Sequence, residues 1–366
     1  VFARSQLIDA ISHFSARTFG YPAMPLDGLG TGLKADYALS GQCRLADSTV
    51  TVDLVLFDVA SQTAIWSGKE QISLQSFLAG DSGLAEQVVS NVLFLIMARS
   101  ARSSISRPLP ELSAHRLMLA AVSLMHAFES PHFDRARDFL LEVSRRCPDH
   151  SLPRAWLAQW HLLRVFQKWS EDPKTDAASA RGEAAAALDL NPTCAHSLAI
   201  DGNINTVIDA DFSVAESRFS DAQAINPSSA TINHLASVLA IFQGRGAEAV
   251  RLTERGQTLS PRDPRRPFFQ ALAAGSYVAG GQYEKAVAMA DGAIRHNPMH
   301  LSAHRARVIA LQLGGRGAQA REACAKLLSI DPRLTVSDYL RNHPAGATEM
   351  GQNWGFALKE AGVPVN

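Results

Sequence analysis

The sequence lacks net charge and long apolar stretches. Lysine and arginine together number 35, and aspartate and glutamate also number 35. This balance gives no electrostatic reason to expect binding to nucleic acid or to an anionic membrane. The longest uninterrupted apolar run, from Val92 to Ala98, has seven residues, whereas a membrane-spanning helix needs about 20. The sequence therefore predicts neither direct nucleic-acid contact nor a membrane-crossing segment.

Cysteine is also scarce, and the cysteines have no paired spacing. The four are Cys43, Cys147, Cys194 and Cys324. Such wide separation suggests neither a disulfide framework nor a zinc site and fits a reducing cytoplasm. The chain begins at Val1 without a methionine or a signal-like apolar segment. We therefore expect a cytoplasmic location and a piece of a longer protein.

Motifs for enzyme chemistry are missing too. The sequence has no Gly-x-Ser-x-Gly elbow and no His-Glu-x-x-His helix, and the Gly-rich segment 28–32 lacks the lysine of a phosphate-binding loop. His296, His300 and His304 have a metal-like spacing, but Pro298 interrupts any helix through them. We predict no catalytic residue, cofactor or metal, and thus no enzyme activity in this chain.

What the sequence does contain is a repeat. Six three-residue segments end in proline, and successive prolines are 44, 35, 34, 37 and 34 residues apart. A period of 34 residues is typical of a helix-turn-helix repeat. The segments are Arg146-Cys147-Pro148, Leu190-Asn191-Pro192, Ile225-Asn226-Pro227, Leu259-Ser260-Pro261, His296-Asn297-Pro298 and Ile330-Asp331-Pro332.

A small residue recurs in register with these prolines. Twelve positions before each proline the residue is alanine, and eight before it the residue is mostly apolar. A recurring small residue indicates the place where two helices cross closely. The alanines are Ala136, Ala180, Ala215, Ala249, Ala286 and Ala320.

These residues resemble the tetratricopeptide repeat (TPR) family, although the family's preferred residues in the first helix are mostly absent. The resemblance implies a TPR-type α-solenoid of about six helix pairs, so the fold class expected is mainly α. We interpret the 44-residue step as an excess of ten residues between the helices of the second unit, at 166–173. Arg262, Arg265 and Arg266 are interpreted as a solvated turn between repeats.

The first hundred residues have a different pattern. Apolar residues at helical spacing predict a helix over 5–14, and a strand is expected near 17–21. Alternating residues predict strands over 37–43 and 50–56 and a third ending near 66–68, and residues 84–99 predict a helix. These elements make a small α+β domain. Residues 37–41, 50–58 and 65–68 resemble the TolB amino-terminal-like domain, whose usual first strand would lie before Val1.

These patterns divide the chain into four parts. The expected parts are a TolB-like α+β domain over 1–101, truncated at its start, a linker over 102–111, helical repeats over 112–333 and a C-terminal helical cap over 334–366. Within the cap, residues 334–340 and 350–361 have helical spacing. Terminal repeats need such caps because their outer face is otherwise exposed.

The combination of the two domains resembles the C-terminal half of two groups of bacterial proteins. One group carries an upstream class III adenylate cyclase domain, and the other a winged helix-turn-helix of the CadC or HilA type. The stretches 156–165 and 334–340 carry this likeness to the cyclase-linked arrays. The resemblance implies a sensory or protein-docking module of a cytoplasmic regulator. The alternatives are the regulatory tail of an adenylate cyclase, part of a DNA-binding regulator, and an architectural scaffold or homodimer.

A ligand is expected on the inner surface, which is lined by the first helix of each repeat. That surface would be aliphatic with sparse polar groups, which suits an amphipathic peptide, a partner helix or a small apolar effector. A second candidate is a pocket beside the irregular loop, where Trp156, Trp160 and Trp169 lie; the alternative is that these tryptophans anchor the loop. The predicted contact residues are Trp160, Arg164, Ile200, Asn203, Ile204, Asn205, His234, Val238, Arg305 and Ile309.

Overall fold

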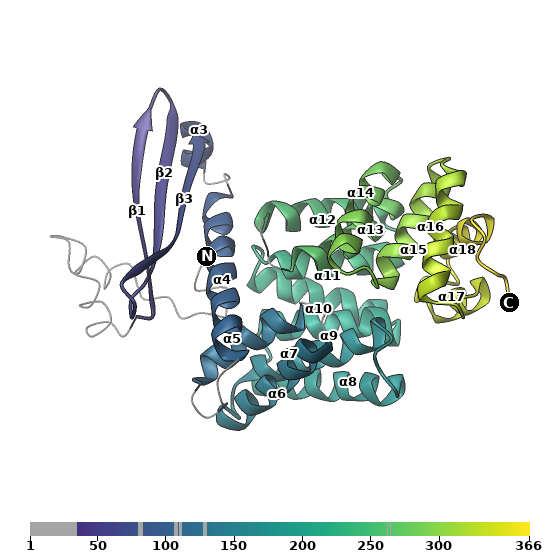
Figure 1. Ribbon diagram of the computed structural model, residues 1–366, viewed down its shortest axis with the longest axis horizontal. Coiled ribbons are helices and arrows are strands. Elements are labelled where there is room, and N and C mark those ends of the chain that lie inside the picture. The colour runs from purple at the N-terminus through teal and green to yellow at the C-terminus, as the bar shows by residue number, and fades with distance from the viewer. Residues whose placement is uncertain are drawn as a thin grey trace. The chain divides into compact units, whose positions relative to one another are not determined.

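The computed structural model of the protein (Figure 1) describes residues 35–79, 83–105, 109, 112–126, 130–261, 263 and 265–366. The chain forms two compact units, Val1–Ile96 and Met97–Asn366. The helix expected over 5–14, the strand near 17–21 and the Gly-rich turn at 28–32 lie outside the described residues.

The first unit contains the predicted three-stranded antiparallel sheet. Its strands are β1 (Tyr37–Ala46), β2 (Thr49–Asp58) and β3 (Thr63–Ser73), in the order β1-β2-β3. Asp47 and Ser48 join β1 to β2 and both have positive φ, 45° and 64°, as a two-residue hairpin turn requires. The β3 strand continues to Ser73, beyond the predicted end at 66–68, because the alternation of side chains persists there.

Two helices follow the sheet, α3 (Leu74–Ala79) and α4 (Leu84–Ile105). The α4 helix is longer than the predicted 84–99 and runs into the linker expected over 102–111; serine-rich composition did not end it. Its window Leu84–Ser104 is 21 residues long with mean hydropathy 1.2, and 44% of it is buried. By length and composition this window is sufficient to cross a membrane, as are many core helices of soluble proteins. The seven-residue run considered above underestimated the length of this helix because polar and charged residues, among them Asn91 and Arg99, interrupt its apolar residues.

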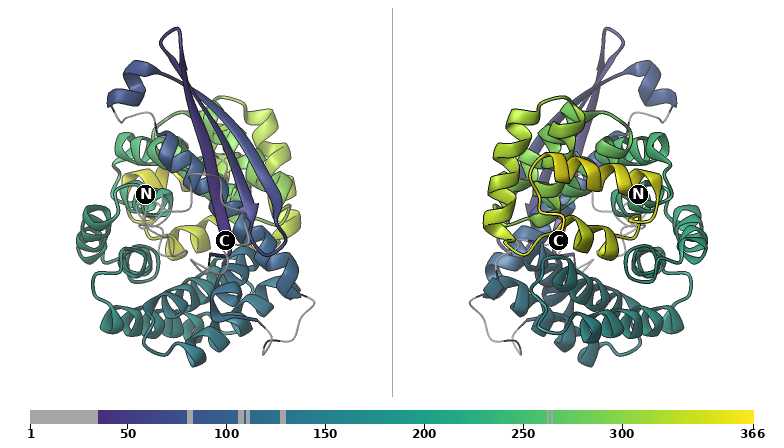
Figure 2. Two further views of the ribbon diagram at one scale, coloured as in Figure 1. Left: turned by 90° about the vertical axis from the view of Figure 1, so that its left-hand side faces the viewer. Right: turned by 90° about the vertical axis from the view of Figure 1, so that its right-hand side faces the viewer.

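The second unit confirms the predicted solenoid. Within the described residues six antiparallel helix pairs follow one another, and each first helix packs against its partner and against the next first helix. Figure 2 shows these pairs following a curved path. The pairs are α5 (Ala114–Met125) with α6 (Ser130–Arg146), α7 (Ser151–Phe166) with α8 (Pro173–Leu190), α9 (Ala195–Ile204) with α10 (Phe212–Ile225), α11 (Ala230–Phe242) with α12 (Gly246–Leu259), α13 (Arg266–Ala279) with α14 (Tyr283–His296), and α15 (Leu301–Leu313) with α16 (Gly317–Ile330).

The prolines end each second helix in the same way. In the third pair, Asn226 N donates to Ala222 O at 2.9 Å and closes the last helical turn, and Ser229 N then donates back to Asn226 O at 3.3 Å. Equivalent bonds recur at all six prolines. The residue before proline avoids the α region, and Asn226 accordingly has φ −136° and ψ 77°. The recurring polar-proline step therefore sets where each pair stops.

The alanines form the helix crossing inside each pair. All six are 0% exposed, and the residues four positions later are also buried. A larger side chain at this position has no space, since protein interiors are already close-packed. These alanines therefore form a continuous seam, called here the alanine seam, which consists of Ala136, Ala180, Ala215, Ala249, Ala286 and Ala320.

In the second to sixth pairs, whose turns the structure describes, the turn between the two helices contains a left-handed residue. Gly244, Gly281 and Gly315 occupy it with φ between 70° and 75°, and the next residue donates its N–H five residues back, as in a Schellman cap. The third pair differs, because α9 continues as a π-helical turn, η3 (Asn205–Asp209), and the left-handed residue is Ala210 with φ 52°. Ala210 therefore adopts a conformation that favours glycine.

The second pair carries the extra ten residues, but only part of them lies between its helices. The α7 helix has 16 residues against 13 in α11, α8 has 18 against 14 in α12, and the turn 167–172 is also longer. In this turn Lys168 is left-handed with φ 57°. Its Nζ donates to Asp331 Oδ2 at 2.5 Å, across 163 residues of sequence. The longer turn thus connects the second pair to the end of the sixth.

Two further helices follow the last pair, α17 (Val336–Asn342) and α18 (Glu349–Glu360). They lie close to the helices predicted over 334–340 and 350–361. The α18 helix packs against α15 and α17. Val336 N donates to Pro364 O at 2.8 Å, which fixes the chain end beside α17.

Substituting tryptophan for Ala215 in the alanine seam should destabilise the protein. Ala215 is 0% exposed, so overpacking is expected to lower the free energy of unfolding by about 1–3 kcal/mol or more. Urea unfolding followed by circular dichroism measures this change. The matched control is Ala224→Trp on the exposed face of the same helix, and equal stability of the two variants would contradict the proposed crossing.

Replacing Ala210 by glycine should stabilise the protein. A left-handed conformation costs a non-glycine residue roughly 1–2 kcal/mol, and glycine at this position removes that cost. Part of the gain is offset because glycine has greater conformational freedom in the unfolded chain. We expect a gain of about 0.5–1 kcal/mol in the same unfolding experiment. The converse change, Gly244→Ala, should be destabilising because Gly244 has φ 74°. Destabilisation by Ala210→Gly, or stabilisation by Gly244→Ala, would show that this account of the turns is wrong.

Candidate functional site

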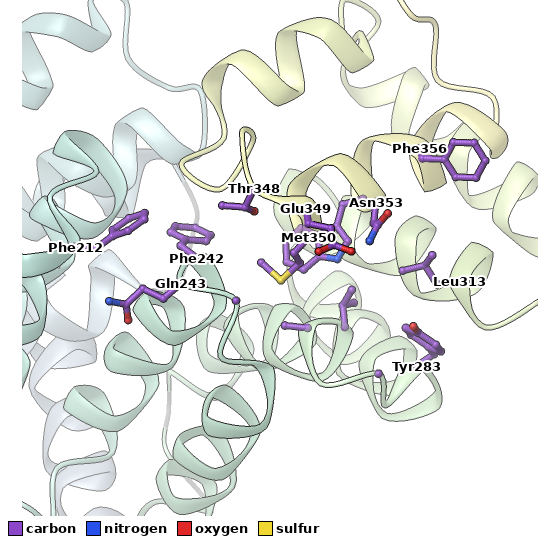
Figure 3. Close-up of a pocket in the computed structure, with 15 residues that line it drawn as sticks. Phe212, Phe242, Gln243, Tyr283, Leu313, Thr348, Glu349, Met350, Asn353 and Phe356 are labelled. Carbon is purple, nitrogen blue, oxygen red and sulfur yellow. The ribbon is translucent and has the colours of Figure 1, made fainter.

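The second unit contains an open groove between the turns of successive pairs and the last helix. Its volume is about 710 Å³, and Figure 3 shows side chains from both walls directed into it. This volume lies within the range typical of ligand pockets. The lining residues, called here the aromatic groove, are Phe212, Phe242, Gln243, Gly244, Val278, Ala279, Gly281, Tyr283, Leu313, Thr348, Glu349, Met350, Asn353, Trp354 and Phe356.

One wall of the groove uses two positions of the repeat. Phe242, Ala279 and Leu313 are the last residues of the first helices α11, α13 and α15. Phe212 and Tyr283 are the first residues of the second helices α10 and α14. Because the pairs stack in register, these positions line up along one side of the array. They lie outside the alanine seam, so their side chains are not needed to form a pair.

The other wall is the first half of α18. This helix begins at Glu349 because Thr348 Oγ accepts the N–H of Gly351 at 3.1 Å. Trp354 is 6% exposed and holds the helix against the array, whereas Phe356 is 61% exposed. The His343 ring connects the two walls, with its centroid 5.0 Å from that of Phe242 and 5.7 Å from that of Trp354. Ring contacts thus join the two walls, and Phe356 leaves an exposed aromatic side chain at the rim of the groove.

The charge of the groove is carried by one carboxylate. Glu349 is the only acidic residue among those lining it, and none of the lining residues is lysine, arginine or histidine. The nearby Arg245 is already paired, with its Nη1 3.1 Å from Glu216 Oε1 and 3.0 Å from Glu248 Oε2. This lining offers a ligand aromatic surface and one negative charge.

The structure places Trp160 and Arg164 together but inside the array. Trp160 is 0% exposed, and its Nε1 donates to Phe133 O at 2.8 Å. The Arg164 guanidinium lies over the Trp160 ring, 5.0 Å from its centroid. Trp169 contacts the edge of Phe133, with ring centroids 5.0 Å apart. These residues anchor the long turn of the second pair, as the structural alternative for the tryptophans predicted.

The predicted contacts on α9 are also largely buried. Ile200 is 0% exposed, Ile204 1% and Asn203 7%. Asn205 donates its Nδ2 to Asp201 O at 2.9 Å, which satisfies the amide locally at the start of the π-helical turn. An incoming peptide would have to displace neighbouring helices to reach the two isoleucines.

The remaining predicted contacts lie on α11 and α15. His234, Val238 and Ile309 are 1%, 8% and 3% exposed. Arg305 is partly buried, 5.7 Å from the Tyr339 ring centroid, and its Nη2 donates to Ser302 Oγ at 3.1 Å. None of the ten predicted residues, all of them described in the structure, lines the aromatic groove. The first helices pack against one another, so the faces expected to be open are largely covered.

The sequence interpretation missed a cluster of histidines that the curved array brings together. The ring centroid of Trp156 lies 5.9 Å from that of His126 and 4.2 Å from that of His196. His234 stacks on Phe269 with centroids 4.4 Å apart. These rings come from separate pairs, so no local sequence motif joins them. Burial lowers the pKa of His126 and His196 to about 3 and that of His234 to about 4.

A buried ion pair lies near these histidines. Arg265 donates from Nε and Nη2 to the two carboxylate oxygens of Asp263, each at 2.9 Å. The side chains are 14% and 6% exposed, so the interpretation of Arg265 as part of a solvated turn is wrong. The short polar sequence of this loop predicted exposure, whereas the burial of Arg265 and Asp263 arises from packing against pairs that are distant in the sequence. Arg262 lies outside the described residues, and Arg266 is exposed.

His300 and His304 have structural contacts. His300 is the N-cap of α15, and its Nδ1 accepts the N–H of Ala303 at 3.4 Å. His304 donates from Nε2 to Pro298 O at 2.9 Å. Both side chains thus support the turn after Pro298.

No protein-family model matches the chain, and no curated protein matches it in sequence. Solved structures with a similar fold include the Cut9–Hcn1 hetero-tetramer of the APC/C, with TM-score 0.48 and 14% identity over 77% of this chain and 47% of that chain. YrrB, described as a TPR protein with an unusual peptide-binding site, has TM-score 0.34 and 13% identity over 53% and 93%. TTC0263, a TPR protein of Thermus thermophilus, has TM-score 0.41 and 16% identity over 54% and 99%. This chain thus spans about half the length of the Cut9–Hcn1 chain it matches.

Lowering the pH from 7 to 5 should reduce the stability of the protein. The histidines of the unfolded chain titrate near 6.5, whereas in the folded protein the pKa values of His126, His196 and His234 are about 3, 3 and 4. Between these values the unfolded state binds more protons, so stability rises with pH. Each histidine should therefore cost about 1.4 kcal/mol per pH unit below 6.5.

Urea unfolding at pH 7, 6 and 5 measures this slope. His234→Gln should make the slope shallower, whatever its effect on stability at pH 7. His115→Gln, which changes an exposed histidine of α5, should leave the slope unchanged. Equal slopes for the native chain and His234→Gln would contradict the assignment.

Proposed function

We propose that this chain is the protein-interaction module of a bacterial cytoplasmic regulator and that it holds an apolar segment of a partner protein in the aromatic groove. The observation that carries this proposal is an exposed aromatic side chain at the rim of a preformed groove. Phe356 is 61% exposed, and Phe212, Phe242, Tyr283 and Met350 line the same space. Partly open aromatic surfaces of this kind are typical anchors for a partner's side chains.

The composition of the groove supports a peptide or partner helix over a nucleotide. Phosphate recognition relies on cationic side chains or on free N–H groups at a helix start. The lining residues include no cation, and the acidic Glu349 stands at the start of α18. Aromatic and aliphatic side chains with a few amides and one carboxylate instead favour an amphipathic segment.

The regulatory context rests on the resemblance of both units to known domains. A TolB-like α+β domain followed by a TPR array is similar to the C-terminal half of class III adenylate cyclases and of CadC- or HilA-type regulators. In this proposal residues 1–101 form the TolB-like domain, 112–333 the repeats and 334–366 the cap. The partner would alter an output domain outside this chain only if it binds two states of that protein with different affinity.

Selection of peptides on the purified chain tests the proposal. Random 12-residue peptides displayed on phage should yield binders rich in large apolar residues, because the groove offers aromatic anchors. Phe356→Ser should weaken these binders about tenfold, equivalent to about 1.4 kcal/mol for the loss of one aromatic contact. Binding is measured by fluorescence anisotropy with synthetic copies of the selected peptides.

The matched control is Leu141→Ser, which removes another exposed apolar side chain, 48% exposed, from α6. Both substituted residues are exposed, so both variants should remain folded. Failure to select any binder would argue against the proposal. So would binders that tolerate Phe356→Ser but lose affinity with Leu141→Ser.

A further inference from the structure

We infer that the segment held in the aromatic groove is a cationic amphipathic helix whose lysine or arginine pairs with Glu349. This inference rests on the proposed function and deepens it by naming the chemistry of the partner. It follows from the position of one carboxylate relative to the apolar walls and from the pairing of the charges around it.

The charges near the groove differ in how they are compensated. Arg245 is held by Glu216 and Glu248, at 3.1 and 3.0 Å. Lys285 on α14 is 3.1 Å from Glu254 Oε1. Glu349 is exposed, and no described lysine, arginine or histidine lies within ion-pair distance of it. A ligand in the groove therefore meets one carboxylate that has no ion-pair partner among the described residues, and a partner's cation complements it.

Glu349 lies on the same face of α18 as the exposed Phe356. Glu349, Asn353 and Phe356 are spaced at i, i+4 and i+7, so they lie along one face of the helix. Seven residues of helix extend about 10 Å. A partner helix lying along α18 would place its cation beside Glu349 and a large apolar side chain beside Phe356. Its two contacts would therefore be about seven residues apart, or two helical turns.

The facing wall explains why the partner must also be amphipathic. Phe212, Phe242, Tyr283 and Leu313 line the groove together with the start of α18. In Figure 3, Phe212 and Phe242 lie on one side of Met350, and Leu313 and Tyr283 lie on the other. A segment between the walls buries an apolar stripe against these residues while its cation faces Glu349. An acidic segment of the same shape would place its own carboxylate beside Glu349, which is unfavourable.

A charge-exchange experiment on the intact chain tests the inference. The probe is a fluorescein-labelled 18-residue helical peptide with a leucine and phenylalanine stripe and one lysine seven residues from a phenylalanine. A second peptide has glutamate in place of that lysine. The lysine peptide should bind the native chain at least threefold more tightly than the glutamate peptide. Glu349→Lys should reverse this preference, and 0.5 M NaCl should reduce it, because the contact is exposed to solvent.

Glu360→Lys provides the matched control, since it makes the same charge change on an exposed residue of α18 outside the groove. It should leave the preference for the lysine peptide in place. Equal binding of the two peptides to the native chain would overturn the inference. So would an equal response to Glu349→Lys and Glu360→Lys.

The proposed function is tested separately with Phe356→Ser. If both peptides bind equally well but lose affinity in this variant, the groove binds apolar segments and only the inference on charge is wrong. If neither peptide binds the native chain, both proposals are wrong. Sedimentation measures the oligomeric state of the chain alone. If the chain is a dimer that Phe356→Ser dissociates, the groove is an interface between two copies, and both the proposed function and the inference on charge are wrong.

Discussion

The close crossing of two helices at the alanine seam is the constraint on which the rest of the second unit depends. A methyl group lets the helix axes approach closely, and the six fully buried alanines repeat that approach at every pair. Because each crossing is alike, each pair is offset from the last by a similar step. The turns of successive pairs therefore line up, and side chains as distant in sequence as Phe212 and Tyr283 line the same groove.

The same repetition makes the array curve, and the curve determines what its interior holds. Lys168 in the second pair reaches Asp331 at the end of the sixth, and His126 lies 5.5 Å, between ring centroids, from Phe268 of the fifth. Trp160 and Trp169 both contact Phe133, and these contacts position the long turn of the second pair. The interior is consequently filled by aromatic rings, neutral histidines and a buried ion pair. It provides rigidity to the array and leaves the inner faces of the first helices largely covered.

The sequence predicted the helix pairs well and the groove poorly, for one physical reason. Proline and alanine act within one pair, so a single chain shows where helices stop and cross. Curvature is the sum of small rotations between pairs and has no local signal. It decided that Ile200 and His234 are buried in the array, and that Phe242 and Leu313, at the last residue of first helices, line the groove beside α18. A large apolar residue at a turn position was the signal available in the repeat alignment.

Position within the repeat also explains why the proposed binding surface lies at the turns. Residues of the alanine seam and of the inner faces are fixed by packing, so changing them alters the fold before it alters binding. The first residue of a second helix differs from pair to pair: it is Gly246 in the fourth pair and Gly317 in the sixth, but Phe212 and Tyr283 in the third and fifth. In the fourth pair packing does decide the residue, because a Cβ at Gly246 would lie 2.1 Å from Ala279 O. Aromatic side chains there do not hold a pair together. Together with Phe356, which is exposed whereas Trp354 on the same helix is buried, they form an apolar surface at the turns, and the proposed function assigns this surface to partner binding.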